Sequence, residues 1–255
     1  MLIALDIGNS SINIGLFDGG RSIWEKIPTH PLGTDKEYAS KMSSLLREKR
    51  IEKEDISCII SSVVLTHTPV LVSAVRMLAG RGEILQASHL MRLGITLKVR
   101  APEEMGTDRI AGAAGAFALY KSPVAVVDFG TATTVTVVAH DGNCRGGAIL
   151  PGLGLMNRSL EAGTSRLKAV DLKPAATALG DDTVNNIRSG LYFGTAGAVE
   201  RILSEIEQET GCDFTTVITG GGADEMEPFM RRSIIKRPHV VLEGLKVLYE
   251  YNKHS

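Results

Sequence analysis

The sequence contains one short pattern twice, and this repetition limits the folds that the chain can adopt. Residues 5–11 read LDIGNSS and residues 127–133 read VDFGTAT. In each copy an apolar, β-rich run ends at an aspartate, a glycine turns the chain, and small hydroxyl residues begin a second, alternating strand. An Asp-Gly turn, Asp18-Gly19 or Asp141-Gly142, follows each second strand. One copy alone is typical of a plain hairpin, but two copies in matching register predict two related half-domains.

The residue types in this pattern are suited to binding phosphate. An aspartate at a strand tip can hold a cation, directly or through water. Glycine allows backbone N–H groups to approach phosphate oxygens closely, and the Ser and Thr hydroxyls add further donors. The two copies therefore predict a kinase-like grip on the phosphates of a nucleotide.

Composition argues against several classes of protein. Lys and Arg number 28 against 29 Asp and Glu, so no overall basic field attracts nucleic acid or an anionic membrane. No apolar run reaches the ~18 residues of a membrane span, and the chain opens on a strand without a signal-type segment, so we expect a cytoplasmic protein. The three cysteines, Cys58, Cys144 and Cys212, are far apart and suit buried thiols in a reducing compartment.

Hydrophobic periodicity predicts an α/β chain, and the repeated pattern divides it into two expected domains, residues 1–116 and 117–255. The expected strands lie near residues 2–7, 12–17, 21–27, 56–64, 95–99, 123–128, 133–139, 145–150 and 215–218. The expected helices lie near 34–49, 69–78, 110–120, 153–161, 181–209 and 241–251, with a helix start at Pro102. The strand 215–218 runs into Gly220-Gly221-Gly222, which resembles a turn on which an adenine could lie. The six histidines are scattered without metal-ligand spacing, so we expect them at the surface.

Several further motifs, taken in order, resemble one known family. Residues 105–111 read MGTDRIA and residues 146–152 read GGAILPG, similar to the Gly-Ala-Asp-Arg and Gly-Gly-x-Ile-x-Pro-Gly motifs of type III pantothenate kinases. This family is part of the actin-like ATPase superfamily. The resemblance covers essentially the whole chain and implies duplicated ribonuclease-H-like domains with an interdomain nucleotide cleft.

The implied reaction is transfer of the γ-phosphoryl group of ATP to the primary hydroxyl of pantothenate, the first step of coenzyme A synthesis. Phosphoryl transfer needs positioning, charge neutralisation and a base for the attacking hydroxyl. Asp108 matches the general base of the family. An aspartate at a helix start beside Arg109 could equally be a cap or an ion-pair partner.

The resemblance also assigns binding roles residue by residue. The positions that match the ATP site are Asp6, Ile7, Gly8, Asn9, Ser10, Ser11, Ile12, Asn13 and Thr131. The positions that match the pantothenate site are Gly106, Thr107, Asp108, Arg109 and Thr183. Asp6 is expected to hold Mg²⁺ through water. Asp128 is expected to bind a monovalent cation, K⁺ or ammonium, with a second Mg²⁺-orienting carboxylate as the alternative.

Two departures from the family pattern concern the acceptor. Val99 stands where family members often carry a substrate-contacting tyrosine, and Lys168 stands where a Leu-Pro pair is common. They leave open a kinase for another small hydroxy acid, or a catalytically weak accessory regulator of transcription. The resemblance further implies a homodimer. The apolar stretch Ala111–Ala118 could form the interface or pack inside its own subunit.

Overall fold

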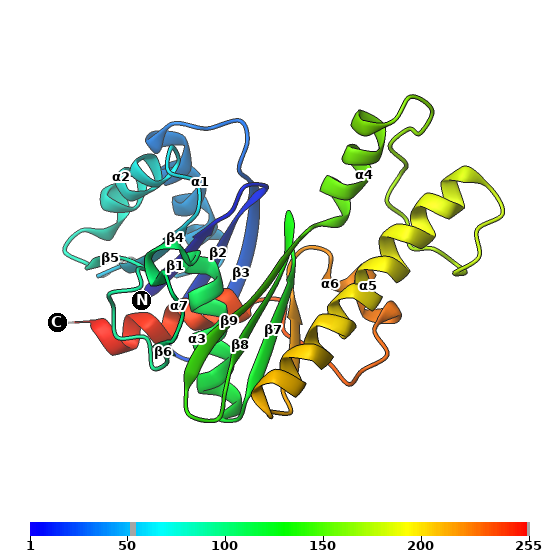
Figure 1. Ribbon diagram of the computed structural model, residues 1–255. Helices are drawn as coiled ribbons and strands as arrows, with labels where there is room; N and C mark the ends of the chain where they lie inside the picture. Colours follow the sequence, from blue (N-terminus) through cyan, green and yellow to red (C-terminus); the bar gives the residue numbers. More distant parts are fainter. Residues whose placement is uncertain (52–54, 254–255) are drawn as a thin grey trace. The chain divides into compact units, whose positions relative to one another are not determined.

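The computed structural model describes residues 1–51 and 55–253, which divide into two compact units (Figure 1). The first unit contains Met1–Thr96, Arg100–Leu119 and the C-terminal segment from His239 onward. The second contains Leu97–Val99 and Tyr120–Pro238. The expected two-domain division differs at its C-terminal end, since the last helix packs in the first unit.

The sheet of the first unit has the order β3-β2-β1-β4-β5. Its strands are β1 (Leu2–Ile7), β2 (Ser11–Asp18), β3 (Arg21–Pro28), β4 (Ser57–Ser62) and β5 (Ile84–Gln86). β1 pairs antiparallel with β2 and parallel with β4. Alternate residues of β1, namely Ile3, Leu5 and Ile7, are buried in one core with α1 (Asp35–Glu48) and α2 (Thr68–Ala79).

Asp6 has the opposite parity in β1 and belongs to the other face of this sheet. Helix α7 (Val240–Asn252) packs on β1, β2 and β4, and Leu242 lies beside Gly15 of β2. Helix α3 (Thr107–Tyr120), preceded by the short 3₁₀ turn η1 (Pro102–Glu104), crosses α7 where Gly115 meets Gly244. A Cβ on Gly244 would lie 1.8 Å from the Ala111 carbonyl oxygen, so only glycine permits this approach. The stretch 111–118 thus packs within its own subunit.

The second unit repeats the same strand order, with one strand added. Its sheet has the order β11-β10-β7-β8-β9-β6. The strands are β7 (Val124–Phe129), β8 (Ala132–Val138), β9 (Asn143–Pro151), β10 (Thr215–Thr219), β11 (Ile235–Lys236) and β6 (Thr96–Leu97). β7 pairs antiparallel with β8 and parallel with β10, as β1 does with β2 and β4. The duplication predicted from two short patterns is therefore confirmed at the level of whole sheets.

Helices of the second unit pack on its sheet and also extend beyond it. The long α5 (Thr183–Thr210) contributes Leu191, Tyr192 and Val199 to the core, together with the short α6 (Ala223–Met226) and the 3₁₀ turn η2 (Glu227–Phe229). Helix α4 (Leu153–Gly163) and the N-terminal half of α5 project away from the sheet of their own unit (Figure 1). No helix in the described part of the chain is both long and apolar enough to cross a membrane.

Candidate active site

Asp6 lies at the centre of the first sheet with a polar partner on each neighbouring strand. The register places Asn13 of β2 and Ser61 of β4 directly opposite it. Asn13 Nδ2 donates to Asp6 Oδ2 at 3.1 Å, and Ser61 Oγ donates to Asp6 Oδ1 at 3.2 Å. Both carboxylate oxygens are thus held by neutral donors from the adjacent strands.

A chain of hydrogen bonds joins Asp6 to the start of α3. Ser61 Oγ lies 2.9 Å from Thr107 Oγ1, which accepts from the Ser62 N–H at 3.2 Å. Since Ser61 donates to Asp6, it must accept from the Thr107 hydroxyl. Thr107 is the first residue of α3, so this series of hydrogen bonds fixes the N-terminus of α3 against the tips of β1 and β4.

The chain of bonds brings a second carboxylate, Asp108, close to Asp6. Two causes raise the pKa of Asp6 from 3.8 to about 6. The larger is burial of the carboxylate, and the second is the negative charge of the nearby Asp108. The hydrogen bonds from Asn13 and Ser61 act in the opposite direction. A buried carboxylate with a raised pKa beside a second carboxylate is typical of a catalytic or cation-binding site.

Gly106 fixes the position of the Asp108 side chain. A Cβ on Gly106 would lie 2.4 Å from Asp108 Oδ1, so the carboxylate occupies the space that a side chain would fill. The Arg109 N–H donates to the same Oδ1 at 2.7 Å. The predicted residues Gly106, Thr107, Asp108 and Arg109 therefore form one turn at the N-terminus of α3, close to Asp6.

The turn of the first unit that the sequence predicts to bind phosphate joins β1 to β2. The Gly8 N–H donates to the Ser11 carbonyl at 3.0 Å, and Asn9 and Ser10 are exposed at the tip. Ile7 and Ile12 are buried in the core beneath it, where their side chains support the turn through packing. The predicted ATP-binding residues 6–13 thus fall into an exposed tip and a buried base.

In the second unit the equivalent aspartate lies against glycine backbone. Asp128 is opposite Thr134 of β8 and Thr219 of β10. Thr219 Oγ1 donates to the Pro238 carbonyl at 3.2 Å. A Cβ on Gly220 would lie 2.2 Å from Asp128 Oδ1, and Gly220 has φ +92°, so glycine is required there on both counts.

The glycine-rich segments of the second unit gather around the turn after β7. The Gly152 N–H donates to the Thr131 carbonyl at 3.1 Å, and the Gly222 N–H donates to the Phe129 carbonyl at 2.9 Å. The motifs at residues 146–152 and 219–223 therefore meet at Asp128 and Thr131. Thr183, by contrast, is exposed at the N-terminus of α5, four residues before the first buried residue of that helix, Ile187.

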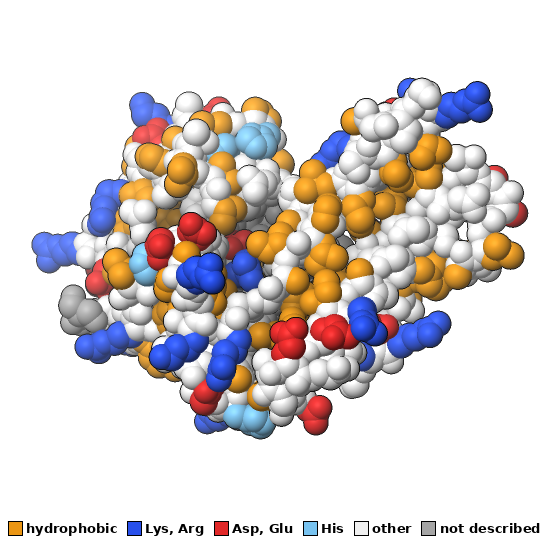
Figure 2. All heavy atoms as spheres, in the orientation of Figure 1, with side chains coloured by type: hydrophobic (Ala, Val, Ile, Leu, Met, Phe, Trp, Pro, Cys, Tyr) orange, Lys and Arg blue, Asp and Glu red, His pale blue; other side chains and the backbone are white. Residues whose placement is uncertain are grey.

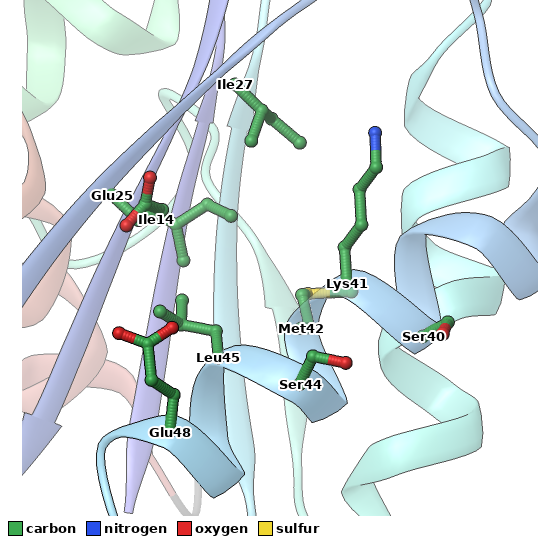
Figure 3. Close-up of a pocket in the computed structure, with 9 residues that line it drawn as sticks. All are labelled: Ile14, Glu25, Ile27, Ser40, Lys41, Met42, Ser44, Leu45 and Glu48. Carbon is green, nitrogen blue, oxygen red and sulfur yellow. The ribbon is translucent and has the colours of Figure 1, made fainter.

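A shallow groove elsewhere in the first unit contains none of the predicted site residues (Figure 3). It has a volume of about 350 Å³ between α1 and strands β2 and β3. Glu25 and Glu48 lie together on one side of it and Lys41 extends on the other. Within the described residues no cluster of three or more His, Cys, Asp and Glu is arranged to hold a metal.

Two expectations about single residue types have opposite outcomes. The three cysteines are buried and free, as predicted. The expectation that the histidines lie at the surface is wrong for His67, which is 2% exposed. Sequence reasoning also assigned no role to Ser61, although the strand order makes it the partner of Asp6. Local spacing could not reveal either one, because the role of Ser61 depends on β4 lying beside β1 and the burial of His67 on its contact with Thr29.

Comparisons with known proteins agree on one family. The family model for type III pantothenate kinase matches residues 2–205. A type III pantothenate kinase of Dehalococcoides mccartyi strain CBDB1 is 34% identical over 254 residues, covering 99% of this chain and 96% of the relative.

Solved structures with low sequence identity share the fold. A Campylobacter jejuni protein described as a Baf family transcriptional activator has a TM-score of 0.59 at 16% identity, with 97% of each chain covered. The activator of 2-hydroxyisocaproyl-CoA dehydratase from Clostridium difficile, solved with bound ADPNP, has a TM-score of 0.55 at 15% identity, covering 98% of this chain and 93% of that one. The fold is that of the actin-like ATPases, and by its sequence this chain belongs to the type III pantothenate kinase family.

Proposed function

We propose that this chain transfers the γ-phosphoryl group of ATP to the primary hydroxyl of pantothenate, giving 4′-phosphopantothenate for coenzyme A biosynthesis. The observation that carries the proposal is the chain of hydrogen bonds from Asp6 through Ser61 to Thr107, which holds Asp108 beside a second carboxylate. Membership of the type III pantothenate kinase family supports the choice of acceptor.

Asp108 is proposed as the general base. It accepts the proton of the attacking hydroxyl as the phosphoryl group is transferred, a contribution typically worth about 10²–10⁴-fold in rate. Gly106 and Thr107 orient it, and the Arg109 guanidinium serves the substrate carboxylate in a two-pronged contact. Thr183, at the start of α5, is proposed as a further acceptor contact.

The ATP phosphates are assigned to the turn formed by residues 8–13 and to Thr131. Asp6 suits Mg²⁺ held through water, because Mg²⁺ usually keeps several waters and takes one or two protein carboxylates plus substrate phosphates. The raised pKa of Asp6 fits this role, since a bound cation would offset the cost of two neighbouring carboxylates. Mg²⁺ would neutralise the charge that develops on the phosphoryl oxygens.

Asp128 is proposed to bind K⁺ or ammonium. Its donor set suits a hard monovalent ion, because the carboxylate lies among glycine turns that also bring the Gly130 and Thr131 carbonyl oxygens close to Gly152. A Cβ on Gly152 would lie 2.3 Å from the first of these oxygens and 2.6 Å from the second. A side chain at residue 152 is therefore excluded, and backbone rather than side chain lines this part of the turn.

A coupled assay of ATP consumption tests the proposal. The purified chain is assayed with pantothenate and with a panel of other small hydroxy acids, each with Mg²⁺ and with K⁺ or Na⁺. We expect pantothenate to be the best acceptor. A preference for another acid would indicate that Val99 and Lys168 belong to a site for a different acceptor. Nucleotide binding without turnover on any acceptor would favour the regulator alternative.

A homodimer is proposed through the projecting part of the second unit. Large hydrophobic side chains are exposed on it, on the adjoining end of β9 and on the segment before α5, and Figure 2 shows hydrophobic atoms gathered on its visible face over α4. These exposed side chains are Ile149, Leu155, Leu179, Val184 and Phe193. Light scattering after size exclusion should give twice the 27.3 kDa chain mass, and Leu155→Asp with Phe193→Asp should give the monomer. A wild-type monomer at micromolar concentration would refute the proposal.

A further inference from the structure

Thr29 makes contacts that point to a role in the phosphate-binding turn. It follows β3 immediately, where Pro28 pairs with Ser11, and so lies alongside the turn that joins β1 to β2. Its Oγ1 donates to the Gly8 carbonyl at 2.6 Å, and its N–H donates to the Ser10 carbonyl at 3.2 Å. One fully buried residue thus binds two carbonyl oxygens of the same turn.

His67 holds Thr29 in this position from a different element. The His67 Nε2 lies 2.8 Å from the Thr29 carbonyl oxygen, and its Nδ1 lies 3.1 Å from Thr66 Oγ1. Because a carbonyl can only accept, Nε2 carries the proton, and Nδ1 can accept from the Thr66 hydroxyl. His67 precedes the first residue of α2, so its ring links Thr29 to that helix, and Thr29 in turn holds the turn.

The direction of these bonds decides what the turn can offer to a ligand. Thr29 donates to two carbonyl oxygens of the turn and His67 donates to the carbonyl of Thr29, while Asn9 and Ser10 remain exposed at the tip. Successive backbone N–H groups of a turn can form an anion-binding concavity. The Gly8 N–H donates to the Ser11 carbonyl, so we infer that the backbone of the exposed tip, at Asn9 and Ser10, is the part that meets a phosphate. A carbonyl that rotated outward would instead repel a phosphate oxygen.

We propose that Thr29 is a positioning residue of the ATP site and that His67 acts through it. This inference rests on the proposed function only for the identity of the nucleotide. The pair does not touch the reacting atoms. It holds the turn in its phosphate-binding conformation before ATP arrives, so its loss should weaken nucleotide binding and leave the acceptor site unchanged.

The test compares Thr29→Val with Thr29→Ser, since the valine variant keeps the shape and the serine variant keeps the hydroxyl. Thr216→Val is a matched control, because Thr216 is a buried strand threonine whose hydroxyl has no hydrogen-bond partner among the described residues. Thr29→Val should raise the KM for ATP by about three- to tenfold, the loss of one hydrogen bond. Thr29→Ser and Thr216→Val should stay within about twofold of wild type, and the KM for pantothenate should not change in any of them.

His67→Leu and His67→Gln test the second member. Glutamine can place an N–H donor near the position of Nε2, so it should restore much of the ATP affinity that leucine loses. Thermal unfolding is measured for every variant. A fall in Tm for Thr29→Val without a change in the KM for ATP, or no rescue by Thr29→Ser, would reduce the pair to a structural role and overturn the inference.

Calorimetry with a non-hydrolysable ATP analogue separates this inference from the proposed function. If the wild type binds the analogue but does not phosphorylate pantothenate, the acceptor assignment fails while the Kd values of the Thr29 variants still decide the inference. If the wild type binds no analogue, both fail, and this is known before any variant is made. Equal Kd values for wild type and Thr29→Val would overturn the inference alone.

Discussion

The two aspartates at the tips of β1 and β7 occupy equivalent places in sheets of the same topology, yet their surroundings differ. Asp6 is opposite Asn13 and Ser61, and both side chains donate to it. Asp128 is opposite two threonines, and one of them, Thr219, donates to a backbone carbonyl instead.

The difference shows how a duplicated fold can acquire two kinds of site. The backbone register fixes which residues stand beside each aspartate, and the side chains at those positions decide its chemistry. In the first unit Ser61 links Asp6 to Thr107 through two hydrogen bonds, and Thr107 directly precedes Asp108. In the second unit Gly220 and Gly130 approach the carboxylate and bring backbone close to it. On the proposed assignment, the first site serves Mg²⁺ binding and proton transfer, and the second site serves a monovalent cation.

The sharpest test of this contrast is Asp108→Asn. Asparagine keeps the shape and hydrogen bonding of aspartate but cannot accept the hydroxyl proton, so kcat should fall by about 10²–10⁴-fold while the Kd for an ATP analogue stays unchanged. Asp18→Asn, at an exposed hairpin end, is the matched control. More than about a tenth of wild-type turnover in the Asp108 variant would remove the base role from this residue.

Asp6→Asn should stabilise the protein in the absence of ligand. The raised pKa means that ionised Asp6 destabilises the folded state by up to about 3 kcal/mol above pH 6. The penalty is absent below the unfolded pKa of 3.8, grows as pH rises to about 6, and is constant above that. Asparagine removes the charge and can still accept from Ser61, while the Asn13 amide can rotate to pair with it.

Chemical unfolding of wild type and Asp6→Asn at pH 8 and pH 4.5 measures this effect. The gain in the free energy of unfolding should be large at pH 8 and mostly lost at pH 4.5, and the variant should be inactive at both. Saturating Mg²⁺ with ADP should narrow the difference at pH 8, because only the wild type binds the metal strongly. An equal gain at both pH values would show that charge burial at Asp6 is not the cause.

Gly106→Ala should damage the first site without unfolding its unit. The new Cβ would lie 2.4 Å from Asp108 Oδ1, and the carboxylate can rotate away at little cost to the fold. We expect kcat to fall by about 10–100-fold, since small displacements of a catalytic group are costly, with Tm almost unchanged. Gly197→Ala is the control, because a Cβ there meets no atom within 4 Å. Unchanged kcat in Gly106→Ala would argue against the position assigned to Asp108.

Much of this architecture follows from local sequence pattern, and the exceptions have physical reasons. Alternating strands such as Ser11–Asp18 were predicted to within about a residue, because one face of each is buried. The two- and three-residue strands β11 and β5 are too short to show alternation and were missed. The predicted helix start at Pro102 is a 3₁₀ turn, and α3 begins only at Thr107.

Long-range partners could not be predicted from local pattern. The aspartates were found because each ends an apolar run before a glycine, but the bond from Ser61 to Asp6 exists only because β4 lies beside β1. The same holds for the buried His67, whose burial depends on its contact with Thr29. The place of α7 in the first unit likewise depends on the close approach of Gly244 to α3, which no local periodicity encodes.

The other side of the comparison, Asp128, is tested through its proposed monovalent cation. If Asp128 holds K⁺ or ammonium, replacing K⁺ by Na⁺ should lower turnover by about tenfold, and Asp128→Ala should remove both the activity and its response to K⁺. Asp141→Ala, in the exposed turn that follows β8, is the control for losing a carboxylate. Full activity in a buffer free of K⁺ and ammonium would show that the second aspartate has another role.

The smallest expected effect concerns the acceptor, where Val99 replaces a tyrosine that is frequent in the family. Val99 is half-buried, and a Cβ built on Gly146 would lie 3.5 Å from its Cγ1, so the absence of a side chain at Gly146 leaves room beside residue 99. A tyrosine hydroxyl could restore one neutral hydrogen bond, worth about 0.5–1.5 kcal/mol. Val99→Tyr should therefore lower the KM for pantothenate several-fold, up to about tenfold, with kcat and the KM for ATP unchanged. Val99→Phe adds the ring without the hydroxyl and should not reproduce the gain. If neither variant lowers the KM for pantothenate and the wild type prefers another hydroxy acid, that acid is the acceptor. The contrast between Asp6 and Asp128 does not depend on which acceptor is used.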